Sequence, residues 1–237
     1  MNTMNVEQIK RSIHVDFLRL SASGKSSVWI FILLPFVFAV MGLISGDRGV
    51  ELSMTGSVAG ICALYAVLMG MMIFANEDMT GNISMNGILP VSRSNQVSAR
   101  YALMAVFSLV AAVETVVCVV MLLHEDLPSP WVMAGIGCGV LFVALLLGGL
   151  VVPIFYRFPI TQAMGWAFGG LGALFLLVFM VVRFMPNDKL HRVVEWVTTT
   201  KLGAVPWAAI IGAVICVVVF VGSLLISSRI YRRKELS

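Results

Sequence analysis

The sequence predicts an all-α fold, namely a polytopic membrane protein with six transmembrane helices and an N-terminal amphipathic helix at the membrane interface. Of the 237 residues, 59% are hydrophobic and only 12% are charged. Soluble domains carry roughly 25% charged residues and about 45–50% apolar ones. The hydrophobic residues also gather in six runs, each long enough to cross the ~30 Å hydrocarbon layer as a helix. Composition and run length therefore both indicate the membrane class.

The six runs are continuous rather than alternating, which favours helices over a membrane barrel. A helix also satisfies every backbone hydrogen-bonding group inside lipid. No polar stretch approaches the ~50 residues of a separate soluble domain, so residues 1–237 are expected to form a single domain. The predicted spans are about 27–44, 57–75, 102–123, 131–155, 166–184 and 206–226.

A helix is predicted over residues 4–22, before the first span. Val6, Ile9, Ile13, Phe17 and Leu20 recur at helical spacing and form one apolar face, whereas most of the charged side chains lie off it. A helix of this kind is expected to lie in the cytoplasmic membrane interface. The alternative is an ordinary surface helix that packs on the spans.

The positions of the basic residues predict the orientation. With six spans both termini share one side, and that side holds 11 of the 16 lysine and arginine residues. Because cytoplasmic loops are enriched in these residues, both termini are expected in the cytoplasm, in a multi-pass protein of the cell membrane. The net charge of +4 is then a matter of membrane orientation, and no nucleic-acid partner is expected.

Little in the sequence favours catalysis, a metal site or a bound cofactor. Ser23-Gly24-Lys25-Ser26 resembles the end of a phosphate-binding loop, but Arg19 stands where that motif needs its first glycine. The cysteines lie in apolar runs without the spacing of metal ligands, and the histidines lie in polar segments. The chain is thus not expected to be an enzyme, and any ATPase activity must reside on another chain.

Glu114 is the one acidic residue inside a predicted span. An ionisable group at that depth is costly and by default marks a functional position. A proton relay or cation site would need a partner, and no other span carries a central charged residue. A structural carboxyl, facing a neighbouring helix or a water-filled cleft, is therefore the alternative.

The most informative polar stretch lies between the second and third spans, on the expected cytoplasmic side. It contains Glu77 and Asp78, followed by Leu89-Pro90-Val91-Ser92-Arg93 and then by Arg100 before an aromatic residue. Pro90 interrupts one helix and Ser92 can cap the next, which would continue into the third span. A helical segment held in this way at the membrane surface can transmit force from a soluble partner.

This stretch resembles the loop of the type-2 ABC exporter permeases, in particular the small six-span group that includes bacterial exporters of antimicrobial and cytolytic peptides. Their loop carries a similar Leu-Pro-Val-Ser-Arg, followed by an apolar residue and a basic residue before an aromatic. The C-terminal segment, residues 227–234, is also similar to their usual ending. In layout the resemblance covers most of the chain, but at the level of residues it is confined to these two stretches.

The resemblance implies two permease subunits, identical or homologous, embedded in lipid above two separate ABC ATPase subunits. ATP and Mg would be bound by the ATPases and not by this chain. The implied cargo is an amphipathic or antimicrobial peptide, moved out of the cell. By position, the implied ATPase-coupling residues are Glu77, Asp78, Leu89, Pro90, Val91, Ser92, Arg93 and Arg100.

Two other functions stay open on the sequence alone. One is a non-transporting immunity or sensor subunit that sequesters a peptide in the membrane. The other is an ion-coupled transporter that uses Glu114, although no inverted repeat of the kind common in such transporters is evident.

Overall fold

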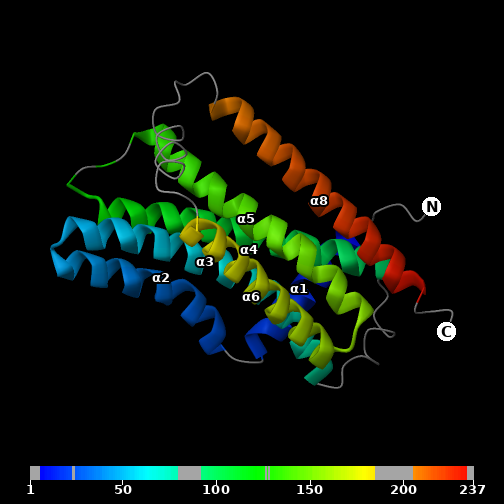
Figure 1. Cartoon of the computed structure of the whole chain (residues 1–237). Helices are drawn as coiled ribbons and strands as arrows, with labels where there is room; N and C mark the ends of the chain where they lie inside the picture. Colours follow the sequence, from blue (N-terminus) through cyan, green and yellow to red (C-terminus); the bar gives the residue numbers. More distant parts are fainter. Residues whose placement is uncertain are drawn as a thin grey trace.

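The computed structural model describes residues 6–22, 25–79, 92–125, 127, 129–184 and 205–233, and all regular structure within them is helical (Figure 1). The all-α class is thus confirmed for this part of the chain. The helices are α1 (Val6–Ala22), α2 (Lys25–Ser45), α3 (Arg48–Met79), α4 (Arg93–Leu122), α5 (Pro130–Arg157), α6 (Ile160–Phe184) and α8 (Val205–Arg233).

Four helices are long and apolar enough to cross a bilayer, judged over the described residues. These stretches are Arg48–Asn76, Ser94–Leu122, Pro130–Arg157 and Ile211–Arg233. They fall in α3, α4, α5 and α8 and contain most of four predicted spans. The predicted spans 27–44 and 166–184 fall in α2 and α6, and the apolar part found for α2, Trp29–Ser45, is shorter than the other four. The count of six crossings therefore stays a prediction.

The helices form one bundle in which α3, α4 and α5 occupy the centre (Figure 1). Helix α8 packs along α5 and α4, α2 packs on α3 and α4, and α6 rests mainly on α5. Glycines permit the close contacts. A side-chain carbon added at Gly148 of α5 would overlap the thioether of Met104 on α4, and one at Gly149 would lie 3.6 Å from the Cα of Phe220 on α8. Small residues of this kind let membrane helices approach one another.

A tight reversal sets α2 beside α3. Gly46 takes the left-handed conformation, with φ of +59°, directly after α2. Asp47 then accepts a hydrogen bond at Oδ1 from the backbone N–H of Gly49, 2.7 Å away, at the start of α3. A left-handed glycine followed by a capping aspartate ends one helix and begins the next within a few residues.

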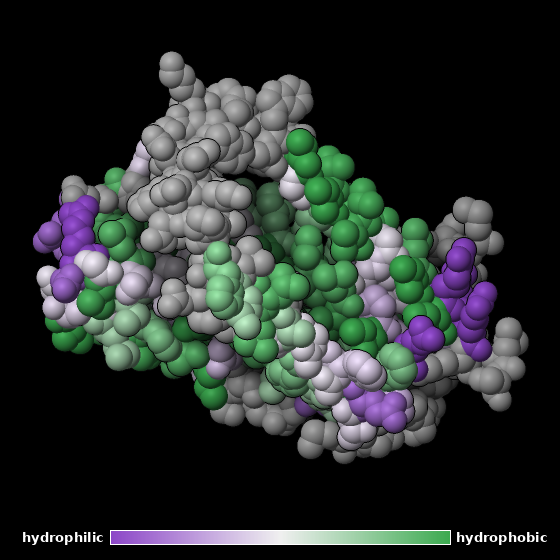
Figure 2. Space-filling view, in the orientation of Figure 1, coloured by the Kyte–Doolittle hydropathy of each residue, from purple (hydrophilic) through white to green (hydrophobic). Residues whose placement is uncertain are grey.

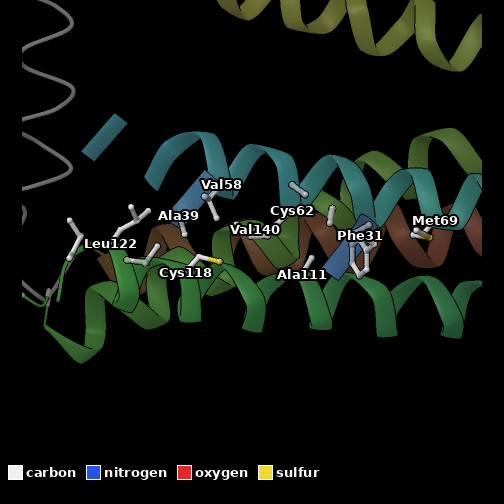
Figure 3. Packing of buried hydrophobic residues seen from close by; sticks show 14 residues of the cluster. Phe31, Ala39, Val58, Cys62, Met69, Ala111, Cys118, Leu122 and Val140 are labelled. Atoms are coloured by element: carbon white, nitrogen blue, oxygen red, sulfur yellow. The ribbon is translucent and has the colours of Figure 1, made fainter. Parts of the chain in front are cut away.

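The buried core runs along the bundle in two main apolar clusters. One joins α2, α3, α4 and α5, and its side chains interdigitate between those helices, as Figure 3 shows for Ala39, Val58, Cys118, Leu122 and Val140. The other joins α3, α4, α5 and α6 around Phe74, Tyr101, Phe155 and Tyr156. Three cysteines, Cys62, Cys118 and Cys216, are buried, whereas Cys138 is exposed on α5.

The outer surface of the bundle is apolar over much of its length. Hydrophilic residues gather toward the ends of the molecule, and apolar residues cover the side of α8 between them (Figure 2). Large exposed apolar side chains also line α2 and α4, among them Leu33, Val37, Leu109 and Val113. Apolar surface this extensive is stable only against lipid or another protein.

The helix expected at 4–22 is present as α1, but its buried side differs from the expected apolar face. The helix packs on α4, α3 and α2. Its most buried residues are Ser12, Asp16 and Leu20, whereas Val6 and Phe17 of the expected face are largely exposed. The reason is that Asp16 points toward a buried arginine on α4, which rotates the polar residue inward. Val6 and Phe17 are thereby left for the membrane interface, where their location stays a prediction.

Candidate functional site

Among the expected coupling residues, Ser92 is the cap of α4, as its sequence position predicted. Its side-chain oxygen accepts a hydrogen bond from the backbone N–H of Asn95 at 3.4 Å. Arg93 is the first residue of α4, and Glu77 and Asp78 lie in the last turn of α3. The side chains of these three, and the whole of Leu89, Pro90 and Val91, lie outside the described residues.

Arg100 lies two turns into α4 and is only 5% exposed. Its guanidinium carbon stands 4.7 Å from the ring centroid of Phe74 and 5.7 Å from that of Tyr156. Its Nε lies 3.8 Å from Asp16 Oδ2, and one terminal nitrogen donates a 3.5 Å hydrogen bond to the Tyr156 hydroxyl. A side chain enclosed in this way has no surface for a soluble partner, so any part it plays in coupling is indirect.

The surroundings of Arg100 join five helices at one end of the bundle. Asp16 comes from α1, Phe74 from α3, Arg100 from α4 and Tyr156 from α5, and the Tyr156 ring lies 5.3 Å from that of Tyr231 on α8. We call these five residues the arginine cluster. Arginine suits the place because its planar group stacks on aromatic rings and pairs with a carboxylate at the same time.

Two further contacts hold the first turns of α4 to both terminal helices. Asn95 donates a 2.7 Å hydrogen bond to the side-chain oxygen of Gln8 on α1. Tyr231 of α8 donates a 3.2 Å hydrogen bond to the side-chain oxygen of Gln96. The start of α4, which directly follows the expected coupling segment, is therefore attached to α1 on one side and to α8 on the other.

Further along α4 than Asn95 and Gln96, a chain of hydroxyl groups links α4, α8 and α5. Ser223 donates to the carbonyl of Gly149, so the Tyr101 hydroxyl is the donor toward Ser223. Ser227 then donates to Tyr101 at 2.9 Å. We call Tyr101, Ser223 and Ser227 the hydroxyl chain. All three are buried, and each hydroxyl has a partner, as a polar group in lipid requires.

Glu114 lies elsewhere on α4 and does not join the arginine cluster. The step of 14 residues from Arg100 to Glu114 corresponds to roughly 21 Å along a helix. It is 7% exposed, and both carboxyl oxygens are buried without a hydrogen-bond partner among the described residues. Glu114 lies on the wall of an apolar groove of about 400 Å³ between α2 and α4.

A second apolar cavity, of about 330 Å³, lies between α2, α3 and α6. Four methionines contribute to its wall beside aromatic and aliphatic side chains. Methionine is flexible and polarizable, and it is common on surfaces that accept ligands of varied shape. The lining residues are Ile30, Tyr65, Leu68, Met69, Met71, Met72, Met164 and Phe168.

Sequence reasoning missed most of the arginine cluster and the hydroxyl chain. One available signal was Asp16, an acidic residue that follows Ser12 and precedes Leu20 at four-residue spacing, on what is the buried side of α1. Another was Ser223 and Ser227, which stand one helical turn apart in an otherwise apolar run. Neither signal names its partner, because the partners lie far away along the chain.

The chain was compared with known proteins and with models of protein families. None of the curated proteins matches the chain. A family model does match, described as an ABC-2 family transporter protein, and the match runs over residues 16–232. That range begins at Asp16 and includes α2 to α8 together with every residue of the arginine cluster and the hydroxyl chain. The chain belongs to the ABC-2 family of transporter membrane proteins.

Proposed function

We propose that the chain is the permease subunit of an exporter driven by separate ABC ATPase subunits, and that its cargo is an amphipathic molecule such as an antimicrobial peptide. Family membership supports the role of a membrane subunit without an ATPase of its own. ATP and Mg are then bound by the partner ATPases, and a second permease copy or homologue completes the transporter.

The observation that carries the proposal is the attachment of the start of α4 to the rest of the bundle. The segment from Glu77 to Arg93 joins α3 to α4 and is the proposed ATPase contact. A force applied there reaches Arg100 within two turns, and from Arg100 it reaches α1, α3, α5 and α8 through the arginine cluster. Packed helices with specific polar contacts move as units rather than deform continuously.

In the proposed cycle, ATP binding closes the ATPase pair and displaces the two coupling segments. The interface between the permeases then changes between inward and outward openings. Cargo moves only if it binds these two states with different affinity. The two cavities support a cargo with an apolar part, because both have largely apolar walls.

The arrangement of the chain ends supports the proposed orientation. Gln8 near the start of α1 contacts Asn95, and Tyr231 near the end of α8 contacts Gln96. Both terminal helices thus meet the start of α4 at the same end of the bundle. We place that end in the cytoplasm of a cell-membrane protein, since it also carries most of the lysine and arginine residues.

Co-expression with candidate ABC ATPases from the same genome tests the proposal. We expect one ATPase to co-purify with the chain in detergent, and its ATP hydrolysis to fall when Leu89 or Arg93 is replaced by alanine. Arg48→Ala, at the opposite end of the bundle, is the matched control and should leave hydrolysis unchanged. The proposal fails if no ATPase binds, or if all three variants behave alike.

The same protein preparations can distinguish the two other candidate functions from an exporter. A non-transporting immunity or sensor subunit would protect cells from a peptide without ATP hydrolysis in its complex. An ion-coupled transporter would move cargo in ATPase-free liposomes along an ion gradient and would lose transport in Glu114→Gln. No other predicted span carries a charged residue near its centre, which disfavours a proton relay through Glu114.

A further inference from the structure

The groove between α2 and α4 has apolar walls, and Glu114 is one of the described residues that line it. Ile32 and Phe36 of α2 form one wall. The opposite wall belongs to α4, whose residues recur at helical spacing along it, and the groove opens on the outer side of the bundle. A volume of about 400 Å³ lies within the usual range for small-molecule sites. The residues from α4 are Leu109, Val110, Val113, Glu114 and Val117.

Within the described residues, the groove offers no hydrogen-bond partner for the carboxyl group of Glu114. At the helical rise it lies roughly 18 Å from Ala102 and about 14 Å from Leu123, the two ends of the predicted span, and hence near mid-membrane. Its carboxyl is more than nine-tenths buried, and no described residue gives either oxygen a hydrogen bond. Polar groups buried in a membrane protein normally have a partner, because an unpaired one costs several kcal/mol.

The chemistry of the groove selects the missing partner. The carboxylate attracts a positive charge strongly where the dielectric constant is low. The surrounding side chains accept an apolar body and repel a strongly hydrated ion, which would have to shed its water without replacement ligands. An anionic head group would be repelled. A molecule with an apolar body and one ammonium group matches both features.

We propose that the groove between α2 and α4 is a binding site for a small lipophilic cation, with Glu114 as its counter-ion. The ligand enters sideways from the membrane, because the groove opens on the lipid-facing side of α2 and α4. The idea that this groove binds cargo rests on the proposed exporter function, whereas the idea that it binds a lipophilic cation does not. The ion pair would satisfy the carboxyl group that the described residues leave without a hydrogen bond.

Photo-crosslinking in nanodiscs of zwitterionic lipid tests the site with the full chain and no ATPase. The probe is a decyl trimethylammonium compound that carries a diazirine, and the competitors are decyltrimethylammonium and its neutral analogue with carbon in place of nitrogen. We expect crosslinks on α2 between Ile32 and Phe36 and on α4 between Leu109 and Val117. We also expect the cation to compete at least tenfold better than the neutral analogue.

Two variants and one control make the test specific. Glu114→Gln should remove the preference for the cation, whereas Glu125→Gln, at an exposed acidic residue beyond α4, should keep it. Val113→Phe retains Glu114 but fills the groove, and it should abolish the crosslinks of both α2 and α4. Thermal unfolding in the same nanodiscs verifies that each variant is folded.

Crosslinks outside the groove, equal competition by the neutral analogue, or full cation preference in Glu114→Gln would overturn the proposal. These outcomes are independent of the exporter hypothesis. If an ATPase co-purifies but the groove does not bind the probe, the exporter stands and the site fails. If the probe binds but no ATPase associates, the site stands and the exporter fails.

Discussion

Two acidic side chains of α1 each pair with an arginine, but the two pairs differ greatly in burial. Arg11 and Glu7 lie 3.1 Å apart with side chains 67% and 74% exposed, whereas Arg100 and Asp16 lie 3.8 Å apart at 5% and 4%. An exposed pair contributes about 0–1 kcal/mol. Removing one partner of a buried pair leaves a buried charge, at a cost of about 3–5 kcal/mol.

Asp16→Asn is therefore expected to destabilise the protein strongly, because it removes a buried carboxylate that faces the Arg100 guanidinium. The expected loss is about 3 kcal/mol or more in the free energy of unfolding. Glu7→Gln, on the same helix, should change it by less than about 0.5 kcal/mol. Urea or thermal unfolding in detergent measures both, and equal effects of the two substitutions would contradict the assigned pairing.

The hydroxyl chain gives a second expectation at a single residue. Ser223→Ala removes the group between Tyr101 and the Gly149 carbonyl, and should cost roughly 0.6–1.7 kcal/mol, the range for polar contacts between membrane helices. Ser53→Ala is the control, since the Ser53 hydroxyl donates to the Val50 carbonyl of its own helix. Thermal denaturation in detergent should separate the two variants, and equal melting temperatures would contradict a stabilising role for the hydroxyl chain.

At the scale of the element, the contact of α4 with α5 depends on a missing side chain. Gly148→Leu would drive its side chain into Met104, and overpacking of this kind costs about 1–3 kcal/mol. Gly139→Leu on the same helix meets open space. Both substitutions raise helix propensity equally, so their difference reports packing alone. We expect a lower melting temperature for Gly148→Leu only, and a lowered one for both would argue against this interface.

The sequence predicted the existence of the helices better than their ends. The second span was expected from residue 57, but α3 begins at Arg48. The apolar run gives only the length of the helix that faces lipid. The helix itself continues into polar turns, because the side chains and backbone of those turns can still form hydrogen bonds within it. Thr55, for example, bonds back to the carbonyl of Glu51. The cap at Ser92 was predictable because its signal is local.

Only those residues of the site could be predicted that are conspicuous at their own position in the sequence. Arg100 and Glu114 stand out in the sequence as charged residues at the edge of a span and inside one. The partners of Arg100 do not, because Tyr156 lies 56 positions away and Asp16 lies on another helix altogether. Such pairings come from how helices pack, and the periodicity of a single helix contains no information about them.

At the scale of the whole molecule, six crossings predict which exposed positions face the same side of the membrane. Cysteines introduced at Asp47 and Glu125 should react with a membrane-impermeant maleimide in intact cells, and cysteines at Pro159 and Arg233 only after permeabilisation. The unmodified chain is the control, since its own cysteines lie within helices of the bundle. Labelling of Asp47→Cys only after permeabilisation would contradict six crossings with cytoplasmic termini.

The meeting of α1 and α8 at the start of α4 has a consequence for how the gene can be rearranged. Because α1 begins and α8 ends at the same end of the bundle, two copies can be joined in one open reading frame by a short hydrophilic linker without an additional crossing. In such a tandem fusion each half can carry its own substitution. Asymmetric mutants would then reveal whether the two halves act in turn or together.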